Sequence, residues 1–223
     1  RGRGGPPMSA ISSVERRRAL LLLGPTGSGK TPLGLRLERD GWRGRRCVHF
    51  DFGESLRTAV RGGAAAGSLS AGDLAVIRAS LREGTLLEDE HFPVALKILD
   101  RFADRRRIGP NDLLVLNGLP RHAGQAVGLA ARLTVEAVIV LEAEAGVIRE
   151  RIRRDAGGDR AGRADDSEAE VVRKLDVFKA RTLPLVAHYR SAGVPVVRVA
   201  VGVETRPEDL LPRIEAGLKE NGR

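Results

Sequence analysis

The segment that decides the fold lies at residues 19–31 and reads ALLLLGPTGSGKT. It begins with a short apolar run that is typical of a buried strand. The rest matches G-x-x-x-x-G-K-[ST], with Gly24, Gly29, Lys30 and Thr31 at the fixed positions. A strand that enters a glycine-rich turn and then a helix leaves several backbone N–H groups pointing into one concavity, where the helix dipole also favours negative charge. The segment therefore predicts a loop that binds the phosphates of a nucleotide.

Each residue type in this loop has a chemical role. Lys30 is expected to reach the β- and γ-phosphates, and the Thr31 hydroxyl is expected to ligate Mg²⁺. The residues predicted to surround the phosphates are Gly24, Thr26, Gly27, Ser28, Gly29, Lys30 and Thr31.

Short apolar runs alternate along the chain with segments of helical periodicity. The runs expected to form strands are 19–23, 47–50, 113–116, 137–141 and 196–199. They are apolar throughout instead of alternating with polar residues, which suits strands that are covered on both faces. We therefore predict an α/β fold of three layers, α/β/α, with a five-stranded parallel sheet in the middle.

Two segments interrupt this alternation. About sixty residues of mostly helical character separate the second and third runs, and they predict a helical insertion at residues 52–106. A second segment is rich in glycine and charge, and it predicts a short mobile lid at residues 155–166. The segment after the lid has the strongest amphipathic pattern of the chain, and Pro184 is expected to kink its helix. The apolar stripe of that helix is Val171, Leu175, Phe178, Thr182, Leu185 and Tyr189.

Composition limits the class of protein. The formal net charge is +9, but acidic residues lie between the basic ones and no aromatic residues interleave the basic run at the start, so we expect no nucleic-acid partner. No apolar stretch approaches the roughly 20 residues that cross a bilayer. Residues 1–18 are expected to form a disordered basic leader without the apolar core of a secretory signal. The single cysteine, Cys47, predicts a buried thiol in a reducing compartment. We expect a cytoplasmic protein that does not contact membranes.

Four motifs, in this order and spacing, resemble those of the adenylate kinase family of nucleoside monophosphate kinases. The first is the phosphate loop. The others read DFGESLR at residues 51–57, NGLPRHAGQ at residues 117–125 and GRADDSE at residues 162–168. The likeness extends over residues 20–218, and it implies a P-loop kinase domain at residues 19–223 in which the insertion binds the monophosphate.

The resemblance implies an enzyme that transfers the γ-phosphoryl group of Mg-ATP to a nucleoside monophosphate. It implies that Arg57 and Arg121 hold the phosphate of the acceptor, since guanidinium groups pair with phosphate oxygens bidentately. Phe52 is expected to lie close to the acceptor base, and Gln125 to read that base through its amide. Members that prefer pyrimidines tend to have asparagine there, so Gln125 favours AMP.

The resemblance also assigns residues to the donor and to the transition state. Arg151 is expected to lie against the donor adenine. Arg163 is expected to move onto the transferred phosphoryl group when the lid closes. The catalytic set that the resemblance implies is Lys30, Arg121, Arg163 and Lys174. Most members of this family work as monomers, and we expect the same here.

Three positions depart from the family pattern. Asn117 stands where the family has an aspartate that ends the third strand and orients the water shell of Mg²⁺, and Asp51 or Glu54 on the neighbouring strand end could substitute for it. Lys174 stands in place of an arginine and lacks its planar fork. Asp155 stands where a second lid arginine is expected, although Arg154 or Arg160 could serve after a small shift of the loop.

These departures leave two alternatives open. The first is a kinase that acts on another monophosphate or another small acceptor, because Phe52 replaces a small polar residue near the acceptor base and either stacks on that base or reshapes the pocket. The second is a nucleotide-binding regulatory protein with weakened catalysis, because Asn117 replaces a carboxylate. An active nucleoside monophosphate kinase of reduced rate is the interpretation that the motifs favour.

Overall fold

The computed structural model describes residues 16–62, 67, 69–158 and 167–221. Its strands are β1 (Arg17–Leu23), β2 (Cys47–Asp51), β3 (Leu113–Asn117), β4 (Leu133–Glu142) and β5 (Val196–Ala200). Its α-helices are α1 (Lys30–Asp40), α2 (Phe52–Val60), α3 (Ala71–Glu83), α4 (Phe92–Arg105), α5 (Ala123–Leu129), α6 (Ala145–Arg153), α7 (Glu168–Val177), α8 (Leu185–Ser191) and α9 (Pro207–Asn221). A 3₁₀ turn, η2 (Asp89–His91), and a π-helical turn, η3 (Phe178–Thr182), complete the described elements.

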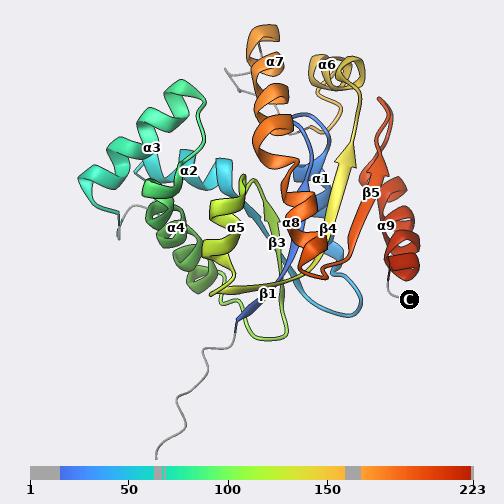
Figure 1. Ribbon diagram of the computed structural model, residues 1–223, viewed down its shortest axis with the longest axis horizontal. Helices are drawn as coiled ribbons and strands as arrows, with labels where there is room; N and C mark the ends of the chain where they lie inside the picture. Colours follow the sequence, from blue (N-terminus) through green and yellow to red (C-terminus); the bar gives the residue numbers. More distant parts are fainter. Residues whose placement is uncertain (1–15, 63–66, 68, 159–166, 222–223) are drawn as a thin grey trace, which may run out of the picture.

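The five strands form one parallel sheet in the order β2-β3-β1-β4-β5 (Figure 1). This sheet confirms the predicted fold class. β4 is longer than the predicted run and begins at Leu133. β1 begins at Arg17, so Arg17 and Arg18, which were expected in the leader, pair with neighbouring strands instead. Of the other leader residues, Arg16 is described, and its Nη1 donates to the Ala130 carbonyl at 3.2 Å, whereas residues 1–15 lie outside the described part of the chain.

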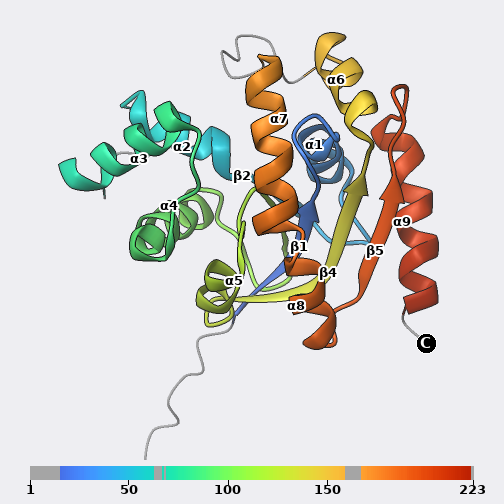
Figure 2. The same ribbon diagram turned by 45° about the horizontal axis from the view of Figure 1, so that its top comes forward.

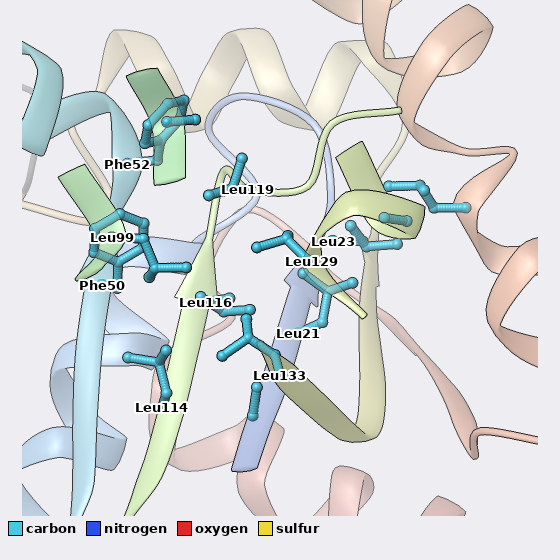
Figure 3. Packing of buried hydrophobic residues seen from close by; sticks show 14 of the residues in the cluster. Leu21, Leu23, Phe50, Phe52, Leu99, Leu114, Leu116, Leu119, Leu129 and Leu133 are labelled. Carbon is cyan, nitrogen blue, oxygen red and sulfur yellow. The ribbon is translucent and has the colours of Figure 1, made fainter. Parts of the chain in front are cut away.

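Helices cover both faces of the sheet. One face packs against α2, α4, α5 and α8, as Figure 3 shows for Leu21 and Leu23 of β1 with Leu129 of α5. The other face packs against α1 and α9, where Leu20 meets Leu33 and Ile214 in one cluster. Figures 1 and 2 show α1 and α8 on opposite sides of the strands. Because successive side chains of a strand point to opposite faces, both sets must be apolar, which explains the uninterrupted apolar runs.

The predicted long helix after the lid is interrupted. α7 ends at Val177, the π-helical turn follows, and α8 begins directly after Pro184. Proline lacks the N–H that would continue the helical hydrogen bonds, and its ring clashes with the carbonyl one turn earlier. The helix is therefore interrupted at the residue where the sequence predicts a kink. The interruption is longer than a kink, because the π-helical turn before Pro184 is part of it. The stripe still faces inward, since Val171, Leu175, Leu185 and Tyr189 are buried.

The helices α2, α3 and α4 occupy the segment predicted as an insertion, and residues 155–158 of the predicted lid are described whereas residues 159–166 are not. The division of the chain into a core, an insertion and a lid remains a proposal. No described helix combines the length and the apolar character that crossing a membrane requires.

Candidate active site

A cleft borders the carboxyl ends of the strands, the edge at which open parallel sheets bind ligands. Its walls come from the β1–α1 loop, from α2 with the segment between α3 and η2, and from α7 with η3. The predicted site residues that line it are Gly24, Thr26, Gly27, Gly29, Lys30, Thr31, Phe52, Arg57, Arg121, Gln125, Arg151 and Lys174. Ser28 of the same loop is fully buried, and Arg163 lies outside the described residues.

The phosphate loop needs glycine at two positions where it packs against α6. Gly27 and Gly29 have φ values of 74° and 98°, a backbone conformation that side chains other than glycine rarely adopt. A Cβ on Gly27 would lie 2.8 Å from the Ile152 side chain. A Cβ on Gly29 would lie 3.2 Å from Nη2 of Arg151. The loop can therefore lie close to α6 only because these residues carry no side chain.

Lys30 lies over the rim of this loop. Its Nζ donates to the carbonyl oxygens of Gly24 and Pro25, each at 2.7 Å. The ammonium group is thus held beside the concavity by neutral carbonyls, which phosphate oxygens could replace with stronger charge-assisted bonds.

Arg151 joins the phosphate loop to the segment between β5 and α9. Its Nε donates to the Gly27 carbonyl at 3.0 Å. Its Nη1 lies within 2.8–2.9 Å of the carbonyl oxygens of Gly202, Val203 and Thr205. The side chain is buried, so these bonds make Arg151 a positioning residue of the loop as well as a lining residue of the cleft. Contact with the donor adenine stays a prediction.

Thr31, Asp51 and Asn117 form a hydrogen-bonded cluster at the base of the cleft. The Thr31 hydroxyl donates to Oδ2 of Asp51 at 2.9 Å. Nδ2 of Asn117 lies 3.0 Å from the Thr31 hydroxyl and 3.1 Å from the same Asp51 oxygen. A hydroxyl and a carboxylate are hard oxygen donors of the kind that Mg²⁺ binds in phosphate sites, where it needs only one or two protein ligands. The residues present therefore fit a magnesium ion.

Arg57, Arg121 and Phe52 also line the cleft. Arg57 comes from α2, where its Nε donates to Glu54 at 2.9 Å, and Arg121 comes from the segment after β3, where its side chain is exposed to the cleft. The backbone of Arg121 is fixed, because its carbonyl accepts from the Thr182 hydroxyl at 2.9 Å. Phe52 begins α2 and is buried beside these groups. The structure thus brings the predicted acceptor residues together.

Backbone groups of two separate segments hold the side chain of Gln125. Its Oε1 accepts from the backbone N–H of Arg121 at 2.8 Å, and its Nε2 donates to the Leu87 carbonyl at 2.7 Å. Both ends of the amide are therefore bonded to backbone, and the side chain is buried. Gln125 thus joins the backbone at Leu87 to the backbone at Arg121. Recognition of a base by its amide stays a prediction.

Contacts that the sequence did not predict connect α7 and η3 to the facing wall. Arg173 donates to the Glu83 carbonyl at 2.5 Å, and Arg181 pairs with both oxygens of Glu88 at 2.7 and 3.1 Å. The guanidinium of Arg181 lowers the pKa of the Glu88 carboxyl. Lys174 lines the cleft between these contacts. No local pattern could have revealed these pairs, because their members lie about ninety residues apart in the sequence.

Comparison with known proteins gives a consistent result. An adenylate kinase from Parvibaculum lavamentivorans is 31% identical over 180 residues, which cover 78% of this chain and 80% of the relative. An adenylate kinase from Deinococcus radiodurans is 30% identical over 213 residues, which cover 92% and 98%. An adenylate kinase from Synechococcus sp. (strain CC9311) is 32% identical over 184 residues, which cover 80% and 87%.

Two further comparisons concern family models and solved structures. No protein-family model matches the chain. The crystal structure of a gluconokinase from Sinorhizobium meliloti 1021 has a TM-score of 0.51 and 17% identity, covers 92% of this chain and 94% of its own, and shows a likeness of fold. The sequence identity over most of the length of several relatives, together with the phosphate loop and the parallel sheet, shows that the chain belongs to the adenylate kinase family, a family of nucleotide kinases.

Proposed function

We propose that this protein transfers the γ-phosphoryl group of ATP, bound with Mg²⁺, to AMP and so forms two molecules of ADP. The observation that carries this proposal is the arrangement of the cleft. The phosphate loop with Lys30 and the two arginines Arg57 and Arg121 line one and the same cleft. Two nucleotides can meet end to end only where fixed cations offset the repulsion between their phosphates.

The reaction needs positioned charge more than covalent chemistry. A phosphate oxygen of AMP attacks the γ-phosphorus of ATP, and a new P–O bond forms. The bond between the γ-phosphorus and the bridging β–γ oxygen breaks, and ADP leaves with that electron pair. The attacking oxygen is already anionic at neutral pH, so the protein does not need a general base.

The cleft residues divide between donor and acceptor. Lys30 would leave the carbonyls of Gly24 and Pro25 and bind the β- and γ-phosphates, while Arg57 and Arg121 would hold the phosphate of AMP. Lys174 would approach the transferred group from α7, and Arg163 from the lid. Thr31 would hold Mg²⁺, which when bound supplies positive charge to the phosphate oxygens.

A different monophosphate is the second candidate acceptor. The amide of Gln125 is bonded to backbone at both ends. Phe52 lines the cleft but is buried, with its ring centroid 6.0 Å from that of Phe50, so it shapes the pocket wall. This favours an acceptor site whose preference depends on shape as well as on hydrogen bonds.

The experiment measures ADP formation from ATP and Mg²⁺ with AMP, CMP, UMP or GMP as acceptor. We expect AMP to give the highest kcat/KM. Lys30→Ala removes a cation at the transferred phosphates, so we expect kcat/KM to fall by at least about 10²-fold. Lys179→Ala is the matched control, because Lys179 is an exposed residue of η3 outside the cleft.

Three outcomes separate the proposal from its alternatives. A higher kcat/KM with CMP, UMP or GMP would favour the second acceptor. ATP binding without ADP formation from any monophosphate would contradict the proposal and favour a regulatory nucleotide-binding protein. An equal loss in Lys30→Ala and Lys179→Ala would contradict the role of the loop lysine.

A further inference from the structure

Among the described residues that line the cleft, Asp51 is the sole carboxylate. The basic residues that line the same cleft are Lys30, Arg57, Arg121, Arg151, Arg173 and Lys174. A negative charge among phosphate-binding residues is expected to face a cation, either a side chain such as Arg121, whose charged form the Asp51 carboxylate favours, or a metal ion. Asp51 is also the acidic group that touches the hydroxyl of the phosphate-loop threonine, at 2.9 Å.

Sheet register explains how this carboxylate reaches Thr31. P-loop enzymes that bind Mg²⁺ pair the loop hydroxyl with an aspartate at a strand end. Here the strand next to β1, β3, ends in Asn117, which offers an amide and no charge. Asp51 of β2 is the register partner of Asn117, so it lies one strand spacing away, about 4.8 Å, at the same edge of the sheet. The carboxylate at the end of β2, one strand farther from β1 than Asn117, therefore still reaches the Thr31 hydroxyl.

Hydrogen bonds hold the Asp51 side chain in one orientation. Its Oδ1 caps α2 by accepting from the Glu54 backbone N–H at 2.9 Å. Its Oδ2 accepts from Thr31 and from Nδ2 of Asn117. Asn117 is buried, and it donates to Asp51 where an aspartate at the same position would place a second negative charge. The amide at position 117 is therefore complementary to the carboxylate at position 51.

Glu54 does not share this position. Its carboxylate accepts from Arg57 at 2.9 Å and from the Thr58 hydroxyl at 3.3 Å, along the exposed side of α2. Of the two residues that the sequence offered as substitutes for a carboxylate at position 117, Asp51 alone contacts Thr31.

We propose that Asp51 supplies the carboxylate that binds the Mg²⁺ of the bound nucleotide, and that Asn117 is a positioning residue that holds this carboxylate in place. The inference rests on the proposed function only in requiring that Mg²⁺ and a nucleoside triphosphate bind. It explains why the chain can lack an aspartate at position 117. It also predicts that Asn117→Asp alone does harm, because the amide that donates to Oδ2 of Asp51 and orients it is replaced by an acceptor.

The test exchanges the two side chains. Asp51→Asn, Asn117→Asp and the double exchange are compared with the wild type for binding of the non-hydrolysable analogue AMP-PNP, by calorimetry, with Mg²⁺ and with EDTA. The quantity measured is the factor by which Mg²⁺ tightens binding. Asparagine caps helices about as well as aspartate, so Asp51→Asn should keep α2 intact. Unchanged affinity in EDTA would show that the loop is intact in each variant.

We expect the tightening by Mg²⁺ to fall by about 10- to 100-fold in Asp51→Asn. It should also fall in Asn117→Asp, and it should recover in the double exchange, which returns one carboxylate and one amide to the cluster. Glu54→Gln is the matched control and should keep the tightening.

Retention of the full effect in Asp51→Asn, or its loss in Glu54→Gln, would overturn the inference. So would a gain in Asn117→Asp alone, because that carboxylate would then act independently of Asp51. No acceptor is present in this experiment. A failure to phosphorylate AMP therefore contradicts the proposed function without altering this result.

Discussion

Arg151 is the side chain on which the position of the phosphate loop depends. Its guanidinium bonds to the Gly27 carbonyl on one side and to three carbonyls between β5 and α9 on the other. A lysine has one compact ammonium group and cannot bridge both sides. Four carbonyls would lose a charged donor in Arg151→Lys, so we expect the unfolding free energy to fall by about 1–3 kcal/mol. We also expect AMP-PNP to bind more weakly, because the loop loses its support.

Urea unfolding and calorimetry check this prediction. Arg149→Lys is the matched control, since Arg149 is exposed on the same helix and should change the unfolding free energy by no more than about 0.5 kcal/mol. Equal unfolding free energies for Arg151→Lys and Arg149→Lys would show that the hydrogen bonds of Arg151 do not stabilise the fold.

At the scale of elements, η3 is tied to the opposite wall of the cleft by the pair of Arg181 and Glu88. Both side chains are partly exposed, so Glu88→Gln should lower the unfolding free energy by only about 0–1 kcal/mol at pH 7. Arg181 lowers the pKa of Glu88 below its ordinary value of 4.5. A lowered pKa in the folded state means that the stabilisation is present above the pKa of the unfolded chain and is lost as the pH falls through the folded value.

The difference between the wild type and Glu88→Gln should therefore be present at pH 7 and vanish at the acid end of the range. Urea unfolding at a series of pH values measures it. A difference that is the same at pH 7 and well below pH 4.5 would mean that charge pairing is not its cause. If small-angle scattering also shows a more open cleft in Glu88→Gln, the pair of Arg181 and Glu88 also holds the two walls of the cleft together.

At the scale of the whole molecule, Cys47 reports on the integrity of the core. The thiol lies in the cluster between the sheet and the helices α1 and α9, and burial raises its pKa from 9.0 to about 11. At pH 8 the Cys47 thiol of the folded protein is therefore almost entirely protonated, and a thiol reagent in solution cannot reach the buried sulfur. We expect Ellman's reagent to label the native protein slower than the urea-unfolded chain by about 10³-fold or more, because labelling requires unfolding.

Labelling at increasing urea concentrations should follow the unfolding curve measured by circular dichroism. Rapid labelling in the absence of urea would show that the α1 and α9 layer opens independently of the rest of the molecule.

How far the sequence predicts the fold depends on the range of the interactions involved. The five apolar runs and the loop at residues 24–31 are local patterns, and they were sufficient to predict the parallel sheet and its helices. The pattern also indicated the break at Pro184, because proline acts on its own turn. The extent of that break was not predictable, since the π-helical turn before it depends on how η3 packs against Arg121 and the facing wall.

The candidate site divides in the same way. The glycine-lysine motif alone predicted the phosphate loop, and the resemblance to adenylate kinases pointed to the other residues that line the cleft. Only the tertiary structure decided what those residues bond to. Gly27, one partner of Arg151, lies 124 residues away along the chain, and Leu87, one partner of Gln125, lies 38 residues away. Asp51 and Asn117 meet Thr31 because β2 and β3 pair in register, and a register is settled by the packing of the whole sheet.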